Sequence, residues 1–278
     1  MAYPTVSSPY GLKPINLIGG QVFAGATRNL PIQYGYSSNI FYGDVVSLAR
    51  GFVNRLAVTS AGGSGLVGIF LGCSYTNPLT KQKTFSQYWP ASTLAGDAVA
   101  IVCDDPDTVF QGVVASGTTV VGSAALAVVG QNLQMIDNAG NVNTGDSLNA
   151  IQGLSGAGAP ATTAAFPLRV IGVVPESAYA YTGVGSSSST TITLTSGLTG
   201  AILAGADVSY IAANGQLVET GSYVQANVAA GGTSVLVNVA PLGGAIPASS
   251  TIVFTMYPEL KVKLNFGAHE YYVATASA

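Results

Sequence analysis

Three carboxylates stand within four residues at Asp104-Asp105-Pro106-Asp107. Oxygen ligands of this kind are what Ca²⁺ prefers, so a calcium site at Asp104, Asp105 and Asp107 is one interpretation. A polar turn is the other, because aspartate side chains accept hydrogen bonds from nearby backbone N–H groups and proline fixes φ. We favour the turn and keep the cation site as the alternative.

A second acidic segment, Asp137 to Asp146, has the composition of a calcium loop but not its spacing. Ala139 occupies the third position, where a ligand is required, and no glutamate closes the loop. We therefore interpret this segment as the loop of a β-hairpin.

His269 is the one histidine and lies beside Glu270, so the two could act as an acid–base pair. No serine or cysteine nucleophile motif accompanies them, and we interpret His269 as a surface or interface residue. Cys73 and Cys103 stand 30 residues apart without a CxxC motif, which is typical of small buried side chains. The sequence therefore predicts no enzyme, no cofactor and no metal centre.

Charged residues make up 8% of the chain, whereas globular proteins average about 25%. Nine Lys and Arg residues in 278 cannot form the basic footprint that nucleic acid requires. Surface charge normally keeps soluble domains apart, so we infer that other protein covers much of this exterior in the working state. This is the main functional inference that composition supports.

Neither a leader nor a membrane span is expected. The opening MAYPTVSSPYGLKP has no basic and apolar regions of a signal peptide, which is consistent with synthesis in a cytoplasm. The charge-free stretch at residues 108–136 is interrupted by Ser116, Gly117 and other polar or small residues. A span needs about 20 predominantly apolar residues, so we expect no contact with a membrane.

Hydrophobic alternation predicts strands. It is clearest at Lys261–Phe266, with Val262, Leu264 and Phe266 inward, and at Thr233–Val239, with Val239 among the inward residues. Further short β-rich segments are 44–48, 66–75, 97–103, 108–115, 168–174 and 191–195. Asn214-Gly215 predicts a hairpin with a type I′ turn. One short helix is expected at 122–129. The predicted fold class is all-β, with a barrel or sandwich main domain, a small inserted β domain and little helix.

Charge also divides the chain. Residues 177–256 contain no Lys or Arg and are dense in Ser and Thr. The final strand, after Tyr257, again contains lysine, as the chain before residue 177 does. We predict a main domain made of residues 1–176 and 257–278, with residues 177–256 inserted in one of its loops. Three prolines between Pro4 and Pro14 predict an extended N-terminal arm.

Several blocks in order resemble a family of tailed-bacteriophage structural proteins, common among phages of cyanobacteria and marine bacteria. The blocks are PYGLKPINLIGG (9–20), YGDVV (42–46), GIFLGCSY (68–75), FSQYWP (85–90), DDP (104–106), PLRVIGVV (167–174) and LKVKLN (260–265). Residues 177–256 depart from shorter relatives. The resemblance implies a head decoration, or cement, protein on the capsid exterior. It also implies the major capsid protein as partner.

Aromatic residues supply the candidate interface, because Tyr and Trp bury much area at little entropic cost. We expect Tyr10 and Leu12 to anchor the N-terminal arm to a partner. Two aromatic stretches, around Tyr34–Tyr42 and at Tyr88-Trp89, supply further interface residues. The full set is Tyr10, Leu12, Pro14, Tyr34, Tyr36, Tyr88 and Trp89. Closed symmetry is the rule for oligomers, and a trimer would suit threefold positions on a shell.

Two alternatives stay open. A tail or fibre component could contact host-surface carbohydrate through residues 177–256. A cell-wall hydrolase would need a paired acid and base in a cleft, for which Asp104, Asp105 and Asp107 are the candidates.

Overall fold

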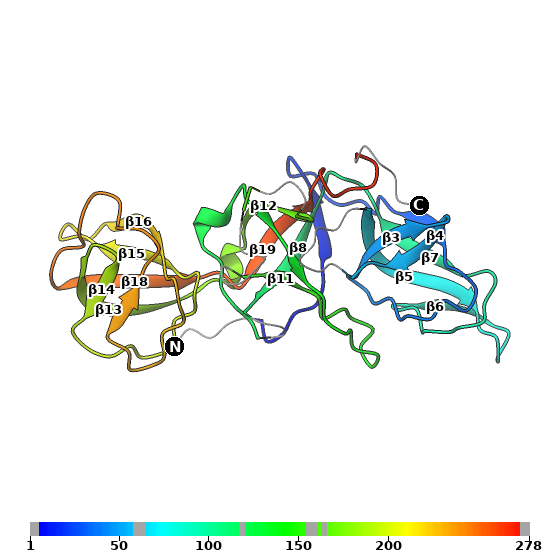
Figure 1. Cartoon of the computed structure of the whole chain (residues 1–278), viewed down its shortest axis with the longest axis horizontal. Helices are drawn as coiled ribbons and strands as arrows, with labels where there is room; N and C mark the ends of the chain where they lie inside the picture. Colours follow the sequence, from blue (N-terminus) through cyan, green and yellow to red (C-terminus); the bar gives the residue numbers. More distant parts are fainter. Residues whose placement is uncertain (1–5, 58–64, 117–119, 154–160, 163–165, 273–278) are drawn as a thin grey trace.

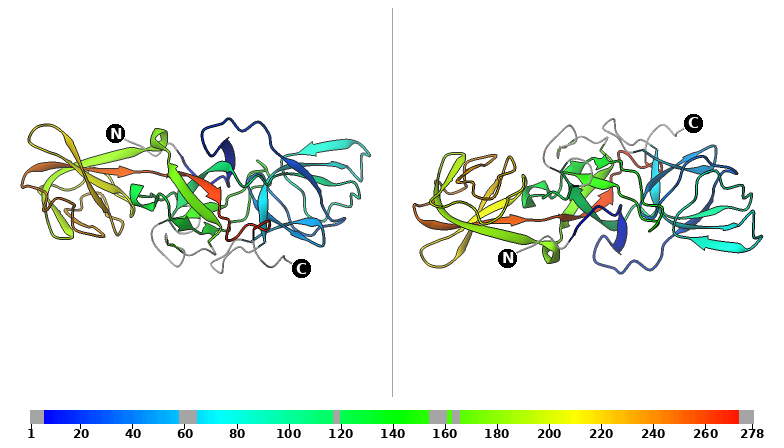
Figure 2. Two further views of the ribbon diagram at one scale, coloured as in Figure 1. Left: turned by 90° about the horizontal axis from the view of Figure 1, so that it is seen from above. Right: turned by 90° about the horizontal axis from the view of Figure 1, so that it is seen from below.

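The computed structural model describes residues 6–57, 65–116, 120–153, 161–162 and 166–272. Across these ranges it contains strands and two 3₁₀ turns but no α-helix, so the all-β prediction is confirmed. Figure 1 shows three β lobes in a row: the outer lobe (residues 18–104), the central lobe (6–17, 105–176 and 257–272) and the inserted lobe (177–256). Both views in Figure 2 show the same order, so the molecule is elongated.

The outer lobe is one antiparallel sheet in the order β2-β7-β5-β3-β4. Strand β3 pairs with the first part of the long strand β5, and β6 pairs with its last part. A parallel bridge between Ile32 and Val53 brings the two ends of the sheet together. The strands are β2 (Arg28–Pro31), β3 (Val45–Ala49), β4 (Phe52–Arg55), β5 (Leu66–Thr76), β6 (Lys83–Ser86) and β7 (Val99–Cys103).

The central lobe is a nearly closed barrel in the order β10-β11-β8-β19-β12-β9. Its two end strands are separated by the single residue Gln134, so they close the ring, while β1 pairs with β8 outside it. The strands are β1 (Lys13–Leu17), β8 (Thr108–Ala115), β9 (Asn132–Leu133), β10 (Met135–Ile136), β11 (Ala150–Gln152), β12 (Leu168–Val173) and β19 (Glu259–Leu264).

The inserted lobe has the order β16-β15-β18-β13-β14-β17, and a bridge between Val224 and Val237 joins its end strands. Alternation positions its core: Ile252, Phe254 and Met256 of β18 are all buried. The strands are β13 (Tyr179–Ser188), β14 (Thr191–Leu194), β15 (Asp207–Ile211), β16 (Leu217–Tyr223), β17 (Ser234–Leu236) and β18 (Ser250–Met256). The 3₁₀ turn η2 (Pro175–Ser177) precedes it.

Burial distinguishes the lobes. One hydrophobic cluster joins Val45, Leu66 and Ile69 of the outer lobe to Phe110 and Val114 of the central lobe. The inserted lobe has a separate cluster of its own, which includes Ile192, Ile252 and Phe254. The outer and central lobes therefore share a core, and the inserted lobe does not contribute to it.

Several local predictions need correction. Asn214-Gly215 does form a hairpin, but Ala212 N donates to Gln216 O (2.8 Å), so the loop has three residues. Gly215 has a positive φ of 81° and Asn214 does not, which excludes a type I′ turn. The helix expected at 122–129 is one 3₁₀ turn, η1 (Leu126–Val128).

Phe266 and Val239 are each 46% exposed rather than inward, because β19 ends at Leu264 and β17 at Leu236. Alternation along a sequence continues past the residue at which the pairing stops. The prediction of which residues face inward is therefore correct only within the residues that form each strand.

The prediction of an extended N-terminal arm is wrong for residues 9–14. Pro9 and Leu12 are buried, Gly11 N donates to Asn149 O (3.0 Å), and Leu12 N donates to Gly43 O (3.1 Å). Residues 9–14 are thus built into the fold and are not a separate arm. Pro4, with the rest of residues 1–5, lies outside the described residues.

Candidate interaction surfaces

Two residues of the predicted interface are part of the core. Leu12 and Trp89 are both 0% exposed. Trp89 packs edge-on against Tyr75, with ring centroids 5.3 Å apart, inside the outer lobe. Leu12 belongs to the core that the outer and central lobes share. Both side chains stabilise the fold and present no surface to a partner.

Tyr10 and Pro14 lie on the central lobe. The Tyr10 hydroxyl donates to Glu259 Oε1 (2.6 Å), and Lys13 Nζ lies 4.3 Å from the Tyr10 ring centroid. Burial, and then the Glu259 carboxylate, raise the pKa of Tyr10. Pro14 is half-buried in β1, opposite Phe110 of β8. These contacts fix the start of the chain against the barrel.

The three remaining tyrosines lie on the outer lobe. Tyr36 accepts the Arg55 backbone N–H at its hydroxyl (2.9 Å), and Tyr88 stacks on Phe41 with centroids 5.6 Å apart. Tyr34 is 60% exposed, and Leu94, near Gly35, is 55% exposed. Of the seven predicted residues, Tyr34 is therefore the one with most of its side chain on the surface.

A more prominent apolar feature, which residue type and spacing did not predict, is the hairpin of β5 and β6. Phe85 of β6 is 78% exposed, and Leu79 in the connecting turn is 90% exposed. Asn77 Oδ1 accepts the N–H groups of Leu79 (2.9 Å) and Thr80 (3.2 Å) and so shapes the turn. Exposed and half-buried side chains alternate along Lys83–Ser86, but the sequence alone does not show that Phe85 takes the exposed side.

A groove of about 430 Å³ lies beside Phe85. Its lining is apolar or uncharged: Tyr42, Leu71, Gly72, Cys73, Phe85, Ser86, Gln87 and Ile101. Gln87 Nε2 donates to Asp146 Oδ1 (2.8 Å), and Tyr42 N donates to Gly145 O (3.0 Å), so the central lobe borders the groove. Burial is the main cause that raises the pKa of Tyr42, and the charge of Asp146 adds to it.

Strand β6 is an edge. It pairs with β5 along one side, and among the described residues no strand pairs with its other side. Its charge is confined to Lys83, whose Nζ lies 3.0 Å from Asp97 Oδ2. Thr76 also donates to that carboxylate, and these hydrogen bonds lower the pKa of Asp97. An unpaired edge beside a non-ionic groove suits an extended segment of another protein.

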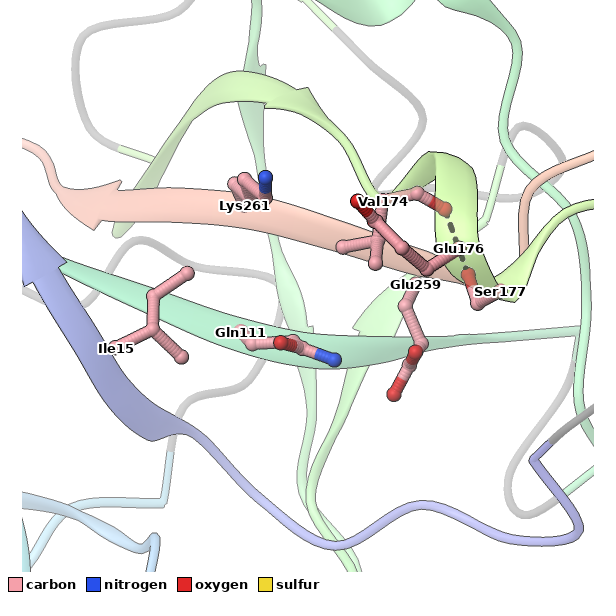
Figure 3. Close-up of a pocket in the computed structure, with 7 residues that line it drawn as sticks. All are labelled: Ile15, Gln111, Val174, Glu176, Ser177, Glu259 and Lys261. Atoms are coloured by element: carbon pink, nitrogen blue, oxygen red, sulfur yellow. Dashed lines mark hydrogen bonds between the residues drawn. The ribbon is translucent and has the colours of Figure 1, made fainter. Parts of the chain in front are cut away.

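A second pocket of about 410 Å³ lies on the central lobe (Figure 3). Ile15, Gln111 and Glu259 lie along neighbouring strands, and Val174, Glu176, Ser177 and Lys261 complete the lining. Ser177 Oγ donates to Val174 O (2.9 Å), and Glu259 is held by Tyr10. Of its acidic groups, Glu259 therefore has a structural partner and Glu176 belongs to the turn η2.

The Asp104–Asp107 run is a turn, as predicted. Asp105 Oδ1 accepts Asp107 N–H (2.9 Å), and Thr108 N donates to Asp105 O (3.1 Å). Asp104 pairs with Arg28 and accepts the Tyr271 hydroxyl (2.6 Å). Across the described residues, no group of three or more His, Cys, Asp or Glu side chains could hold a metal ion.

His269 is not at the surface, contrary to the prediction: it is 0% exposed. Its ring packs against Tyr271 and Tyr272, with centroids 4.8 and 5.7 Å away, and Nδ1 accepts Tyr271 N–H (3.3 Å). Burial lowers the pKa of His269. The main chain of residues 268–270 pairs with Leu66, so this segment is docked onto the outer lobe.

A buried polar cluster ties the outer lobe to the 137–149 loop. Asp44 is 0% exposed and accepts hydrogen bonds from Phe41 N (2.9 Å), Ser147 Oγ (2.6 Å), Asn149 Nδ2 (3.1 Å) and Arg55 Nε (3.1 Å). Burial raises the pKa of Asp44, although these partners oppose the shift. Arg55 also pairs with Asp137. The antiparallel pairing of β10 with β11 confirms that the segment 137–146 lies in a hairpin loop.

No protein-family model matches the chain, and the search of curated proteins found no match. None of the helices in the described part of the chain has the length and apolar character needed to cross a membrane.

Proposed function

We propose that this chain is a virion structural protein without enzymatic activity, a cement protein that binds the outside of a phage head and stabilises contacts between capsid subunits. The observation that carries the proposal is the pair of exposed apolar side chains on the β5–β6 hairpin of the outer lobe, beside a groove with an uncharged lining. Leu79 and Phe85 are 90% and 78% exposed on one hairpin, beside an uncharged groove. Water does not favour such a surface, and a protein partner would cover it.

The resemblance of the sequence blocks to phage decoration proteins supports the choice of partner. The major capsid protein would supply an extended segment that pairs with the free edge of β6 and covers Phe85. Low charge favours this role because the interface then buries few unpaired ions. Further copies of the chain would complete the assembly as a homo-oligomer, for which we propose a trimer on the capsid exterior.

The experiment measures binding of purified protein to expanded capsids. We expect the Leu79→Ser/Phe85→Ser double variant to lose most binding while it keeps the wild-type fold. Leu242→Ser is the matched control, since Leu242 is 71% exposed but lies on the inserted lobe. Equal binding of the double variant and wild type would reject the β5–β6 hairpin as the contact. A deletion that tests the chain start must end before Pro9, because residues 9–14 belong to the fold.

The alternative is a tail or fibre component that contacts host carbohydrate through the inserted lobe. Exposed apolar side chains on that lobe, such as Leu242 and Leu217 (56%), favour it. Copy number separates the two functions: hundreds of copies per particle support cement, whereas a handful support the tail.

A further inference from the structure

The inserted lobe is joined to the central lobe by two adjacent chain connections. Strand β12 leads through η2 into β13, and β18 leads through Tyr257 and Pro258 into β19. Tyr257 is anchored to the central lobe, because its N–H donates to Ser123 Oγ (3.2 Å) and its carbonyl accepts Ala124 N–H (3.0 Å). Met256 already pairs with Tyr179 inside the inserted lobe. The junction of the two lobes, and the point at which they would pivot, therefore lies where residue 256 meets residue 257.

One polar contact opposes this pivot. Asp207, the first residue of β15, accepts the Leu126 backbone N–H of η1 at Oδ2 (2.7 Å). Asp207 and Glu219 of β16 line a cleft of about 240 Å³ with Leu126, Ala127 and Val208. The cleft thus lies between the two lobes, and its walls are apolar apart from these carboxylates and Ser222.

The charges around Asp207 are all of one sign. Glu219 faces it from β16, and the Tyr257 hydroxyl faces both carboxylates from the linker. Residues 177–256 contain no Lys, Arg or His, and neither does the segment 85–167 that carries η1. An ionised Asp207 in the closed cleft therefore has the Leu126 N–H as its partner but no cation.

We propose that Asp207 and the Leu126 N–H form a carboxyl latch that holds the inserted lobe against the central lobe when Asp207 is protonated and weakens when it ionises. A protonated carboxyl still accepts the Leu126 hydrogen bond and loses its repulsion with Glu219. An ionised one is better solvated when the cleft opens. This device is independent of the proposed function.

The direction of the pH effect follows from linkage. Burial raises the pKa of Asp207 to about 6 in the closed arrangement; the Leu126 hydrogen bond opposes this shift and Glu219 adds to it. In the open arrangement the carboxyl is close to its ordinary value near 4. The closed form is thus most favoured below about pH 4, loses ground between about pH 4 and 6, and is constant above that range. Two pKa units correspond to roughly a 100-fold change in the ratio of closed to open molecules.

The test measures the distance between two fluorophores on the full chain. Asn143→Cys on the central lobe and Asn214→Cys on the inserted lobe are exposed positions, and the native Cys73 and Cys103 are buried from the label. We expect the distance distribution to broaden and lengthen from about pH 4 to about pH 7.5. Asp207→Asn keeps an acceptor oxygen without the charge, so it should remain closed at both values. Glu219→Gln should reduce the change.

Asp105→Asn, in the remote turn, is the matched control and should respond to pH like the parent. A distance that does not vary with pH in the parent overturns the latch. So does a change that persists undiminished in Asp207→Asn, since another group would then cause it. Because Asp207→Asn mimics the protonated side chain, its fold is checked by comparison with the parent at low pH.

Discussion

The molecule contains two junctions between lobes, and they are built differently. At the junction of the outer and central lobes, apolar side chains of both lobes form one cluster, and the buried Asp44 bonds to both sides. At the junction of the central and inserted lobes, two chain connections and the Asp207–Leu126 hydrogen bond make the link. Shared apolar burial is hard to undo, whereas a hydrogen bond to a titratable group depends on pH. We therefore expect the first junction to be rigid and the second to be adjustable.

The largest expected effect comes from breaking the rigid junction at Asp44. Asp44→Ala would leave Ser147, Asn149, Arg55 and the Phe41 N–H without their acceptor in a buried site. We expect a loss of about 3–5 kcal/mol in the free energy of unfolding of the outer and central lobes. Denaturant titration followed by Trp89 fluorescence would measure it. A loss below about 1 kcal/mol would show that the cluster does not join the lobes.

Truncating a side chain in the shared core should show that the two junctions contribute differently to stability. Ile69→Ala removes a fully buried side chain from the core common to the outer and central lobes, and we expect a cost of about 2–4 kcal/mol for both lobes together. Ile252→Ala is its match in the inserted lobe and should lower the stability of that lobe alone. Hydrogen exchange resolved by segment measures both. If either variant destabilised all three lobes equally, the outer and central lobes would not be distinguished from the inserted lobe by a shared core.

The adjustable junction should respond to Asp207→Asn in a pH-dependent way. The folded pKa of Asp207, about 6, lies above its unfolded value, so its ionisation lowers stability as pH rises from about 4 to 6. At pH 7.5 the variant should therefore stabilise the closed inserted lobe by about 1–3 kcal/mol, with no effect near pH 4. Thermal unfolding of parent and variant at both pH values tests whether the variant is the more stable protein at pH 7.5. A variant that is less stable at pH 7.5 would reverse our assignment.

The smallest effect is expected at the start of the chain. Tyr10→Phe removes the hydroxyl that bonds Glu259, a residue only 6% exposed, and should cost the central lobe about 1–2 kcal/mol. Tyr34→Phe, on the exposed outer surface, should change stability by less than about 0.5 kcal/mol. Paired denaturation curves distinguish the two. An equal effect of both changes would mean that Tyr10 does not anchor the N-terminal segment.

Alternation along the sequence located many strands well. The segment predicted at 108–115 is β8 with the same bounds, and 191–195 differs from β14 by one residue. The approach failed where pairing stops early, at Phe266 and Val239, because the pattern does not record where a partner strand ends. The interpretation of His269 as a surface or interface residue, made from the lack of a nucleophile motif, was also wrong about its exposure, because the burial of His269 depends on the outer lobe against which this segment packs.

The candidate surface was predicted less well than the fold. Trp89 and Leu12 were selected for residue type, and both lie in cores because Tyr75 and the shared cluster surround them. Residue type and spacing did not predict Phe85 and Leu79 as interface residues, yet the unpaired side of β6 leaves them exposed. Aromatic or aliphatic type sets how much area a side chain can bury, but the neighbouring strands decide whether it does.

Composition and alternation by themselves determined an all-β chain with few charges and a cation-free segment at 177–256, since both are local properties of the sequence. The tertiary structure alone decided that Ile69 and Phe110 share a core, that Asp207 meets Leu126 across 81 positions, and that two junctions of unlike strength result. Such contacts depend on how distant strands pair and pack, and short-range patterns carry no record of that pairing.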